Sequence, residues 1–116
     1  GSEVSEEQIA TFQAEHVEII KMSAPNIQIE EVLQLLGEKG VTSLYVEGGQ
    51  AVHASFLQSG FVNSMITYIA PKVVGGTEAP SMFTDLNIVN MNESFGFVFQ
   101  NVEKIGDDLK IISTLK

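Results

Sequence analysis

Apolar and polar residues follow two patterns along the chain, one typical of helices and one typical of strands. Three segments place apolar side chains three or four positions apart, which is typical of amphipathic helices. These segments are residues 4–14, 29–39 and 50–59. Five shorter runs are rich in Val, Ile and Phe, which is typical of strands. These runs are residues 16–22, 41–46, 63–70, 95–105 and 109–115, and residues 71–84 between them are predicted to be a loop.

Polar and glycine residues mark where the predicted helices begin and end. Ser5 is the expected N-cap of the first helix, and Gln8 stands three residues later, as in a capping box. Gly40 and Gly60 follow the second and third helices, where a residue free to adopt positive φ often ends a helix. The apolar side chains expected to face the core are Ile9, Phe12, Val32, Leu33, Leu35, Leu36, Val52, Phe56 and Leu57.

The order of these elements is α-β-α-β-α-β-loop-β-β, which favours an α/β fold. Two successive β-α-β units predict parallel strands joined by right-handed crossovers. Gly106, Asp107 and Asp108 separate the last two strands and are typical of a hairpin turn, which pairs its strands antiparallel. We therefore expect a mixed sheet in a single domain with no internal boundary.

The composition fits a globular domain. The chain has 116 residues, 44% of them hydrophobic, and no apolar run approaches the length of a membrane span. There is no cysteine, which excludes disulfide and thiolate chemistry and favours a cytoplasmic protein. Gly1 and Ser2 are expected to be the remnant of a removed expression tag. Residues 3–116 are therefore expected to be a piece of a longer protein.

The charge limits the classes of partner. The formal net charge is −9 and the sequence contains no arginine. Nucleic-acid binding depends mainly on Lys and Arg against phosphates, so we expect no nucleic-acid partner, and for the same reason no membrane partner. Any phosphate bound by this chain must rely on backbone N–H groups, a helix N-terminus or the few lysines.

The stretch YVEGGQAVHASFLQSG, residues 45–60, contains the strongest candidate site. Gly48 and Gly49 lie where a predicted strand bends into a predicted helix, and the first N–H groups of a helix lack intrahelical partners. A phosphate can dock on such groups. The alternative is a tight connection that needs flexible residues and binds nothing. The pair is not the GxGxxG dinucleotide motif.

Glu47 lies at the carboxyl end of the predicted central strand, the edge at which open α/β sheets bind ligands. Its carboxylate is suited to accept hydrogen bonds from a sugar hydroxyl or to hold a cationic intermediate. The alternative is a solvated or N-cap-like carboxylate satisfied by the turn, and the sequence leaves both interpretations open.

The other chemically able residues favour structural roles. His16 and His53 lack metal-ligand spacing, so no metal site is expected, and Ser55 lacks a nucleophile-elbow context. Lys72 and the pair at 75–76 fit an ordinary surface loop better than a mobile lid over a pocket.

Three motifs together resemble a known family. The run SLYVEGGQAVHASFLQSGFVNSMITYIAPKVVGG and the closing VEKIGDDLKI resemble the reductase domain of the bifunctional riboflavin-biosynthesis deaminase-reductase. The resemblance covers about residues 16–116, and the joint occurrence of EGG, IAPK and GDDL is far more specific than any one of them. It implies a dihydrofolate-reductase-like fold with three layers, α/β/α.

The resemblance also implies an activity and its site. Gly48, Gly49, Gln50 and Ala51 would offer N–H groups to the pyrophosphate of NADPH, and Glu47 would face the ribose part of a small-molecule substrate. The implied reaction reduces 5-amino-6-(5-phosphoribosylamino)uracil to its ribityl counterpart. The alternatives are a dihydrofolate-reductase-like oxidoreductase with another substrate and a non-catalytic binding or assembly domain that keeps the fold.

The chain departs from the family in one residue and in its length. Asn63 stands where the family often has Asp. The family's domain is nearly twice as long, and its amino-terminal half carries the catalytic Asp and basic substrate-binding residues, so no catalytic residue is expected here. Residues 3–116 therefore resemble the carboxyl-terminal portion of a reductase domain. The sheet is expected either to close up without its missing strands or to pair with a second copy, as a homodimer.

Overall fold

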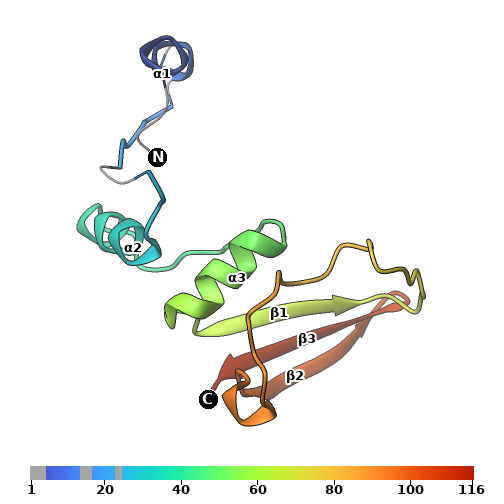
Figure 1. Ribbon diagram of the computed structural model, residues 1–116. Helices are drawn as coiled ribbons and strands as arrows, with labels where there is room; N and C mark the ends of the chain where they lie inside the picture. Colours follow the sequence, from blue (N-terminus) through green and yellow to red (C-terminus); the bar gives the residue numbers. More distant parts are fainter. Residues whose placement is uncertain (1–4, 14–16, 23–24) are drawn as a thin grey trace. The chain divides into compact units, whose positions relative to one another are not determined.

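The computed structural model describes residues 5–13, 17–22 and 25–116 and divides the chain into two compact units (Figure 1). The first unit spans Gly1–Leu44 and the second spans Tyr45–Lys116. The first contains helices α1 (Glu6–Gln13) and α2 (Ile29–Glu38). The second contains helix α3 (Gln50–Ser59), strands β1 (Ser64–Ile69), β2 (Phe97–Ile105) and β3 (Asp108–Leu115), and the short 3-10 helix η1 (Met91–Glu93).

The first unit confirms the predicted helix-end signals. At the start of α1, the Gln8 N–H donates to Ser5 Oγ at 3.3 Å and the Ser5 N–H donates to Gln8 Oε1 at 3.2 Å. These two bonds are the reciprocal pair of a capping box. After α2, Gly40 has a φ of +84°, and the Val41 N–H donates to the Leu36 carbonyl at 3.0 Å. This arrangement is a Schellman motif, which satisfies the last carbonyls of the helix.

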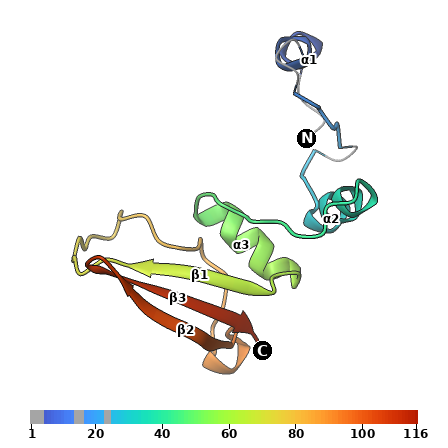
Figure 2. The same cartoon turned by 180° about the vertical axis from the view of Figure 1, so that it is seen from behind.

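The second unit is built on a three-stranded antiparallel sheet in the order β1-β3-β2. β3 is central, and its register pairs Ile112 with Ile66 of β1 and with Asn101 of β2. α3 runs beside β1 in Figures 1 and 2, and it ends at Gly60, which adopts a φ of +78° as its C-cap. The predicted helix at 50–59 and the predicted strand at 63–70 are confirmed.

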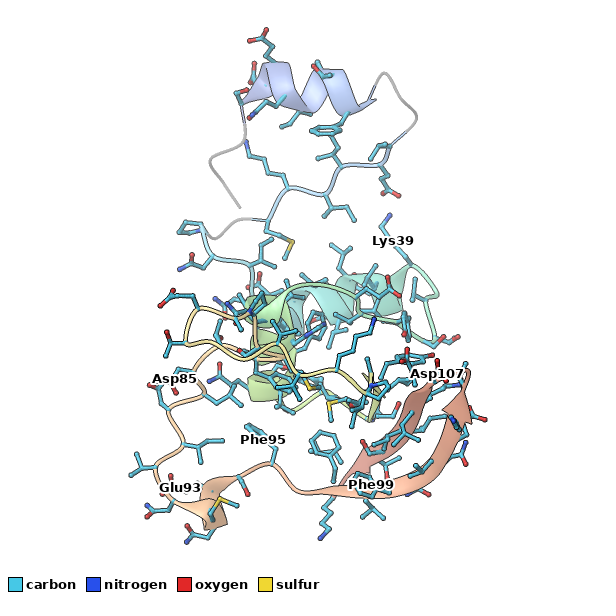
Figure 3. The ribbon with its side chains drawn as sticks, turned by 90° about the vertical axis from the view of Figure 1, so that its right-hand side faces the viewer. Lys39, Asp85, Glu93, Phe95, Phe99 and Asp107 are labelled. Carbon is cyan, nitrogen blue, oxygen red and sulfur yellow. The ribbon has the colours of Figure 1, made fainter. Side chains whose placement is uncertain are left out.

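The carboxyl-terminal hairpin is also confirmed. Two residues connect β2 to β3, and the first of them, Gly106, has a φ of +61°. Two-residue hairpin loops with glycine first need this left-handed conformation. Asp107 follows at the tip of the hairpin (Figure 3). Next to the turn, Glu103 faces Lys110 across the strands at 3.2 Å, and this hydrogen-bonded carboxylate raises the pKa of Lys110.

The parallel β-α-β units are the part of the predicted topology that is wrong for the described residues. Neither 17–22 nor 41–46 forms a strand, and His16 lies outside the described residues. A strand exists only where a neighbour completes its backbone hydrogen bonds. Within the described residues, the strand pairs are β1 with β3 and β2 with β3, and neither 17–22 nor 41–46 takes part in them. The sheet of this structure is therefore antiparallel rather than mixed, and the three-layer arrangement stays a prediction.

Few side chains of the described residues are fully buried. Ala54 and Leu57 of α3 and Ser113 of β3 are the buried ones, which confirms Leu57 as a core residue. Val52 is 42% exposed and Phe12 is 53% exposed, so both were wrongly predicted as core contacts. The sheet also leaves apolar side chains exposed, among them Phe99 of β2 (Figure 3). The core of the second unit is therefore small.

The left-handed turn predicts how substitution of Gly106 affects stability. Gly106→Ala should lower the free energy of unfolding by roughly 1–2 kcal/mol, because an L-residue is strained at positive φ. Gly106→Asn should lower it less, since Asn tolerates that conformation best among residues with a Cβ. Urea unfolding of both variants against the unsubstituted chain measures the difference. Equal losses in the two variants would contradict the turn geometry.

Candidate functional site

The glycine turn leads directly into α3. Gly49 is the N-cap, with φ −83° and ψ 175°, and Gln50 is the first helical residue. The Gly49 carbonyl accepts the first helical bonds, from the Val52 N–H at 3.0 Å and the His53 N–H at 3.2 Å. The helix therefore starts where the sequence predicted, within the second unit.

The backbone donors of the turn have no protein partner. Within the described ranges, no backbone or side-chain acceptor meets the N–H groups of Gly48, Gly49, Gln50 or Ala51, and no side chain caps the helix. All four residues are exposed. Free N–H groups at a helix start carry a partial positive charge and favour an anion. The arrangement can therefore bind a phosphate through the backbone, which suits a chain without arginine.

The two glycines differ in what the fold requires of them. A Cβ at Gly48 would lie 3.1 Å from Val52 Cβ and 3.2 Å from Val52 Cγ1, so close packing on the helix favours glycine there. A Cβ at Gly49 would meet nothing within 4 Å, and its φ is negative. Neither packing nor backbone conformation therefore requires glycine at position 49. Open space above an N-cap also leaves room for a ligand to approach the backbone.

Glu47 precedes the turn and its side chain is exposed. One alternative role, as a cap on α3, is not seen, because the N-cap is Gly49 and no side chain caps the helix among the described residues. The carboxylate stays free to meet solvent or a ligand.

A loop segment contacts the first turn of α3, which the sequence did not indicate. Ser81 Oγ lies 2.9 Å from Gln50 Oε1 and also contacts the Phe83 carbonyl oxygen. The Thr84 N–H donates to the Gln50 carbonyl at 3.3 Å. The loop after β1 thus returns to the end of α3 at which the helix begins (Figure 1). No periodicity or motif marks residues 81–84, so only the tertiary fold reveals the contact.

His53 and Ser55 each contact a backbone carbonyl oxygen. His53 Nδ1 lies 3.1 Å from the Met82 carbonyl oxygen, and its ring meets Phe83 edge-on with centroids 6.1 Å apart. Ser55 Oγ donates to the Ala51 carbonyl one turn earlier, at 2.9 Å. Within the described residues no group of three or more His, Cys, Asp or Glu side chains is placed to hold a metal ion.

The loop between β1 and residue 81 is open to solvent. Gly75 and Gly76 have φ values of +69° and +104°, and the side chains of Val73 and Val74 are 98% and 90% exposed. Lys72 is exposed as well. No hydrogen bond joins these residues to the glycine turn in the described part of the chain, whereas Ser81 and Thr84 both contact Gln50. Among the described helices, none is long and apolar enough to cross a membrane.

Comparison with known proteins identifies relatives along most of the chain. The model of the family described as "RibD C-terminal domain" matches residues 2–111. The riboflavin biosynthesis protein RibD of Bacillus amyloliquefaciens is 35% identical over 100 residues, which cover 86% of this chain and 27% of that protein. The 5-amino-6-(5-phosphoribosylamino)uracil reductase of Buchnera aphidicola is 30% identical over 92 residues, which cover 78% of this chain and 43% of that enzyme.

Solved structures agree on the fold. RibD of Acinetobacter baumannii superposes with a TM-score of 0.79 at 21% identity, covering 97% of this chain and 30% of that one. A pyrimidine reductase-like protein of Corynebacterium diphtheriae superposes with a TM-score of 0.78 at 15% identity, covering 95% of this chain and 44% of that one. This chain thus spans between 27% and 44% of the length of these relatives.

The glycine geometry predicts different effects on stability for two adjacent substitutions. Gly48→Ala should lower the free energy of unfolding by about 1 kcal/mol, because the new Cβ crowds the Val52 side chain. Gly49→Ala should change it by less than about 0.5 kcal/mol, because a weaker N-cap residue is offset by a less flexible unfolded chain. Thermal melts without ligand compare the two variants. A large loss in Gly49→Ala would mean that the fold itself needs this glycine.

Proposed function

The chain belongs to the RibD C-terminal domain family, and from this membership we propose that it is the carboxyl-terminal portion of an NADPH-dependent reductase domain of riboflavin biosynthesis. The proposed reaction reduces 5-amino-6-(5-phosphoribosylamino)uracil to its ribitylamino form. The activity named for the Buchnera relative, a 5-amino-6-(5-phosphoribosylamino)uracil reductase, supports this substrate. The match along residues 2–111 supports the family resemblance carried by the EGG, IAPK and GDDL motifs.

The observation that carries the cofactor assignment is the set of free N–H groups at the start of α3. Four consecutive residues, Gly48 to Ala51, offer donors without protein partners, and Gly49 leaves open space above them. A pyrophosphate needs several donors and close approach to the backbone, and both are present. These residues fit the pyrophosphate of NADPH, which supplies the hydride when bound.

We assign Glu47 to the substrate side of the turn. Its carboxylate is exposed and does not cap the helix, so it is free to accept hydrogen bonds from a ribose hydroxyl. A negative charge next to a pyrophosphate would repel it, so Glu47 serves better as a substrate contact than as a cofactor contact. The protein's contribution is to hold two ligands in a fixed relative orientation.

The activity is tested with the complete reductase that contains this chain. The purified enzyme should oxidise NADPH when 5-amino-6-(5-phosphoribosylamino)uracil is added, and the product should be the ribitylamino compound. NADPH oxidation followed by absorbance, together with product identification by mass spectrometry, gives the answer. An enzyme that binds NADPH but leaves this substrate unreduced would point instead to a related reductase with another substrate.

Gly49→Ala in the complete reductase should weaken NADPH binding by roughly 1–3 kcal/mol, because a Cβ crowds the anion and costs a hydrogen bond to a charged group. The NADPH-induced rise in melting temperature should shrink accordingly. Gly37→Ala is a matched control, since Gly37 in α2 also has open space at its Cβ position. If Gly49→Ala keeps the full NADPH-induced rise, the turn is not the phosphate site.

Glu47→Gln in the complete reductase should lower kcat by about 10- to 100-fold, the scale of one hydrogen bond to a charged group. NADPH affinity should stay nearly unchanged, because the substitution leaves the backbone donors in place. Steady-state kinetics give kcat, and a fluorescence titration gives NADPH affinity. A parallel loss of cofactor binding and apo stability would assign Glu47 to the architecture of the turn instead.

A further inference from the structure

Residues 81–84 and the first turn of α3 form a set of contacts that we name the clasp. It joins Ser81 and Thr84 to Gln50, and Met82 and Phe83 to His53. The two side-chain contacts join residues far apart in the sequence: His53 and Met82 are 29 positions apart, and Gln50 and Ser81 are 31 positions apart. Four contacts from this segment therefore meet a single turn of α3.

We propose that the clasp positions the backbone donors at the start of α3 for phosphate binding, with His53 as its main positioning residue. This inference rests on the function proposed above and adds a set of residues that do not themselves touch the cofactor. It assigns His53 and residues 81–84 to the positioning of the backbone donors.

The peptide plane explains how the clasp reaches a donor. The carbonyl of Gln50 and the N–H of Ala51 belong to one planar trans peptide unit, so they point in opposite directions and turn together. Thr84 donates its N–H to that carbonyl. The bond therefore adds a restraint, beyond the helix itself, on the direction of the Ala51 N–H, which is one of the free donors of the turn. Ser81 holds the Gln50 side chain at the same point.

The partner of His53 determines its tautomer. The Met82 carbonyl oxygen can only accept a hydrogen bond, so Nδ1, 3.1 Å away, must carry the proton. Neutral His53 is therefore the Nδ1–H tautomer, with its lone pair on Nε2. The edge contact with Phe83 holds the ring plane at 64° to the phenyl ring, so the N–H stays aimed at Met82. This bond attaches the 81–84 segment to α3 at Met82.

Prior alignment of donors has an energetic consequence. A donor already aimed at the anion needs no reorganisation when the anion binds, so its interaction appears fully as affinity. Loss of the clasp would leave the same N–H groups in place with a wider range of directions. The expected result is weaker NADPH binding without loss of any residue at the phosphate.

Two variants of His53 in the complete reductase separate the bond from the ring. His53→Phe keeps an aromatic ring against Phe83 and removes the N–H donor, and it should raise the KM for NADPH about three- to tenfold, the scale of one lost hydrogen bond. His53→Asn offers an amide N–H near the Nδ1 position and should stay within about twofold of the unsubstituted enzyme. For both, kcat at saturating NADPH should be nearly unchanged.

Ser55→Ala is the matched control, because Ser55 is exposed on the same helix and bonds only to its own helix in the described chain. It should leave the KM for NADPH unchanged. If His53→Phe does not fold, Ser81→Ala makes the same test by removing the hydroxyl that contacts Gln50. Either of two results would overturn the positioning role. One is an unchanged KM for NADPH in His53→Phe, or in Ser81→Ala where that variant replaces it. The other is an equal rise in KM in His53→Phe and His53→Asn.

A measurement without cofactor separates this inference from the proposed function. Nitrogen-15 NMR of histidine in the apo enzyme should show His53 with its proton on Nδ1, and the Nε2–H tautomer would overturn the clasp. If the Nδ1–H form is found but the unsubstituted enzyme does not bind NADPH, the proposed function fails and the positioning role fails with it. If the unsubstituted enzyme binds NADPH but the His53 variants have the same KM for NADPH as that enzyme, the positioning role of the clasp is wrong and the proposed function stands.

Discussion

An α-helix cannot satisfy its own first N–H groups, and this constraint organises the second unit of the chain. α3 begins at Gln50 after two glycines, and no described residue accepts a bond from the four donors at 48–51. The other groups of this turn do have protein contacts. Gly48 packs on Val52, and the 81–84 segment contacts Gln50 and His53. What is left free is a row of backbone donors with open space above Gly49.

The charge of the protein makes this turn more important. With a net charge of −9 and no arginine, the chain offers few cationic side chains to an anionic ligand. Backbone donors and the helix dipole supply a positive potential that does not depend on side-chain charge. A nicotinamide dinucleotide can therefore bind to an acidic protein, provided that its pyrophosphate meets the backbone.

Local features could be predicted from the sequence, and non-local ones could not. The capping box of Ser5 and Gln8, the left-handed Gly40 and the Gly106 turn all depend on residues a few positions apart, and all three are confirmed. Residues 41–46 have a strand-like composition but no neighbour to pair with, and composition carries no information on neighbours. The clasp was missed for a related reason, because it joins residues about 30 positions apart through carbonyls and single polar side chains. The glycine turn was found because its motif is contiguous, and the structure adds that only Gly48 has a packing reason.

The most direct test of the phosphate assignment is an NMR titration of the complete reductase domain with NADPH, following backbone amides. We expect the amides of Gly48, Gly49, Gln50 and Ala51 to show the largest shifts in this chain, and inorganic pyrophosphate to shift the same amides in the same direction. Amides of the β2–β3 hairpin turn should not move. If NADPH binds while the amides at 48–51 stay in place, the backbone donors at the start of α3 are not the phosphate site.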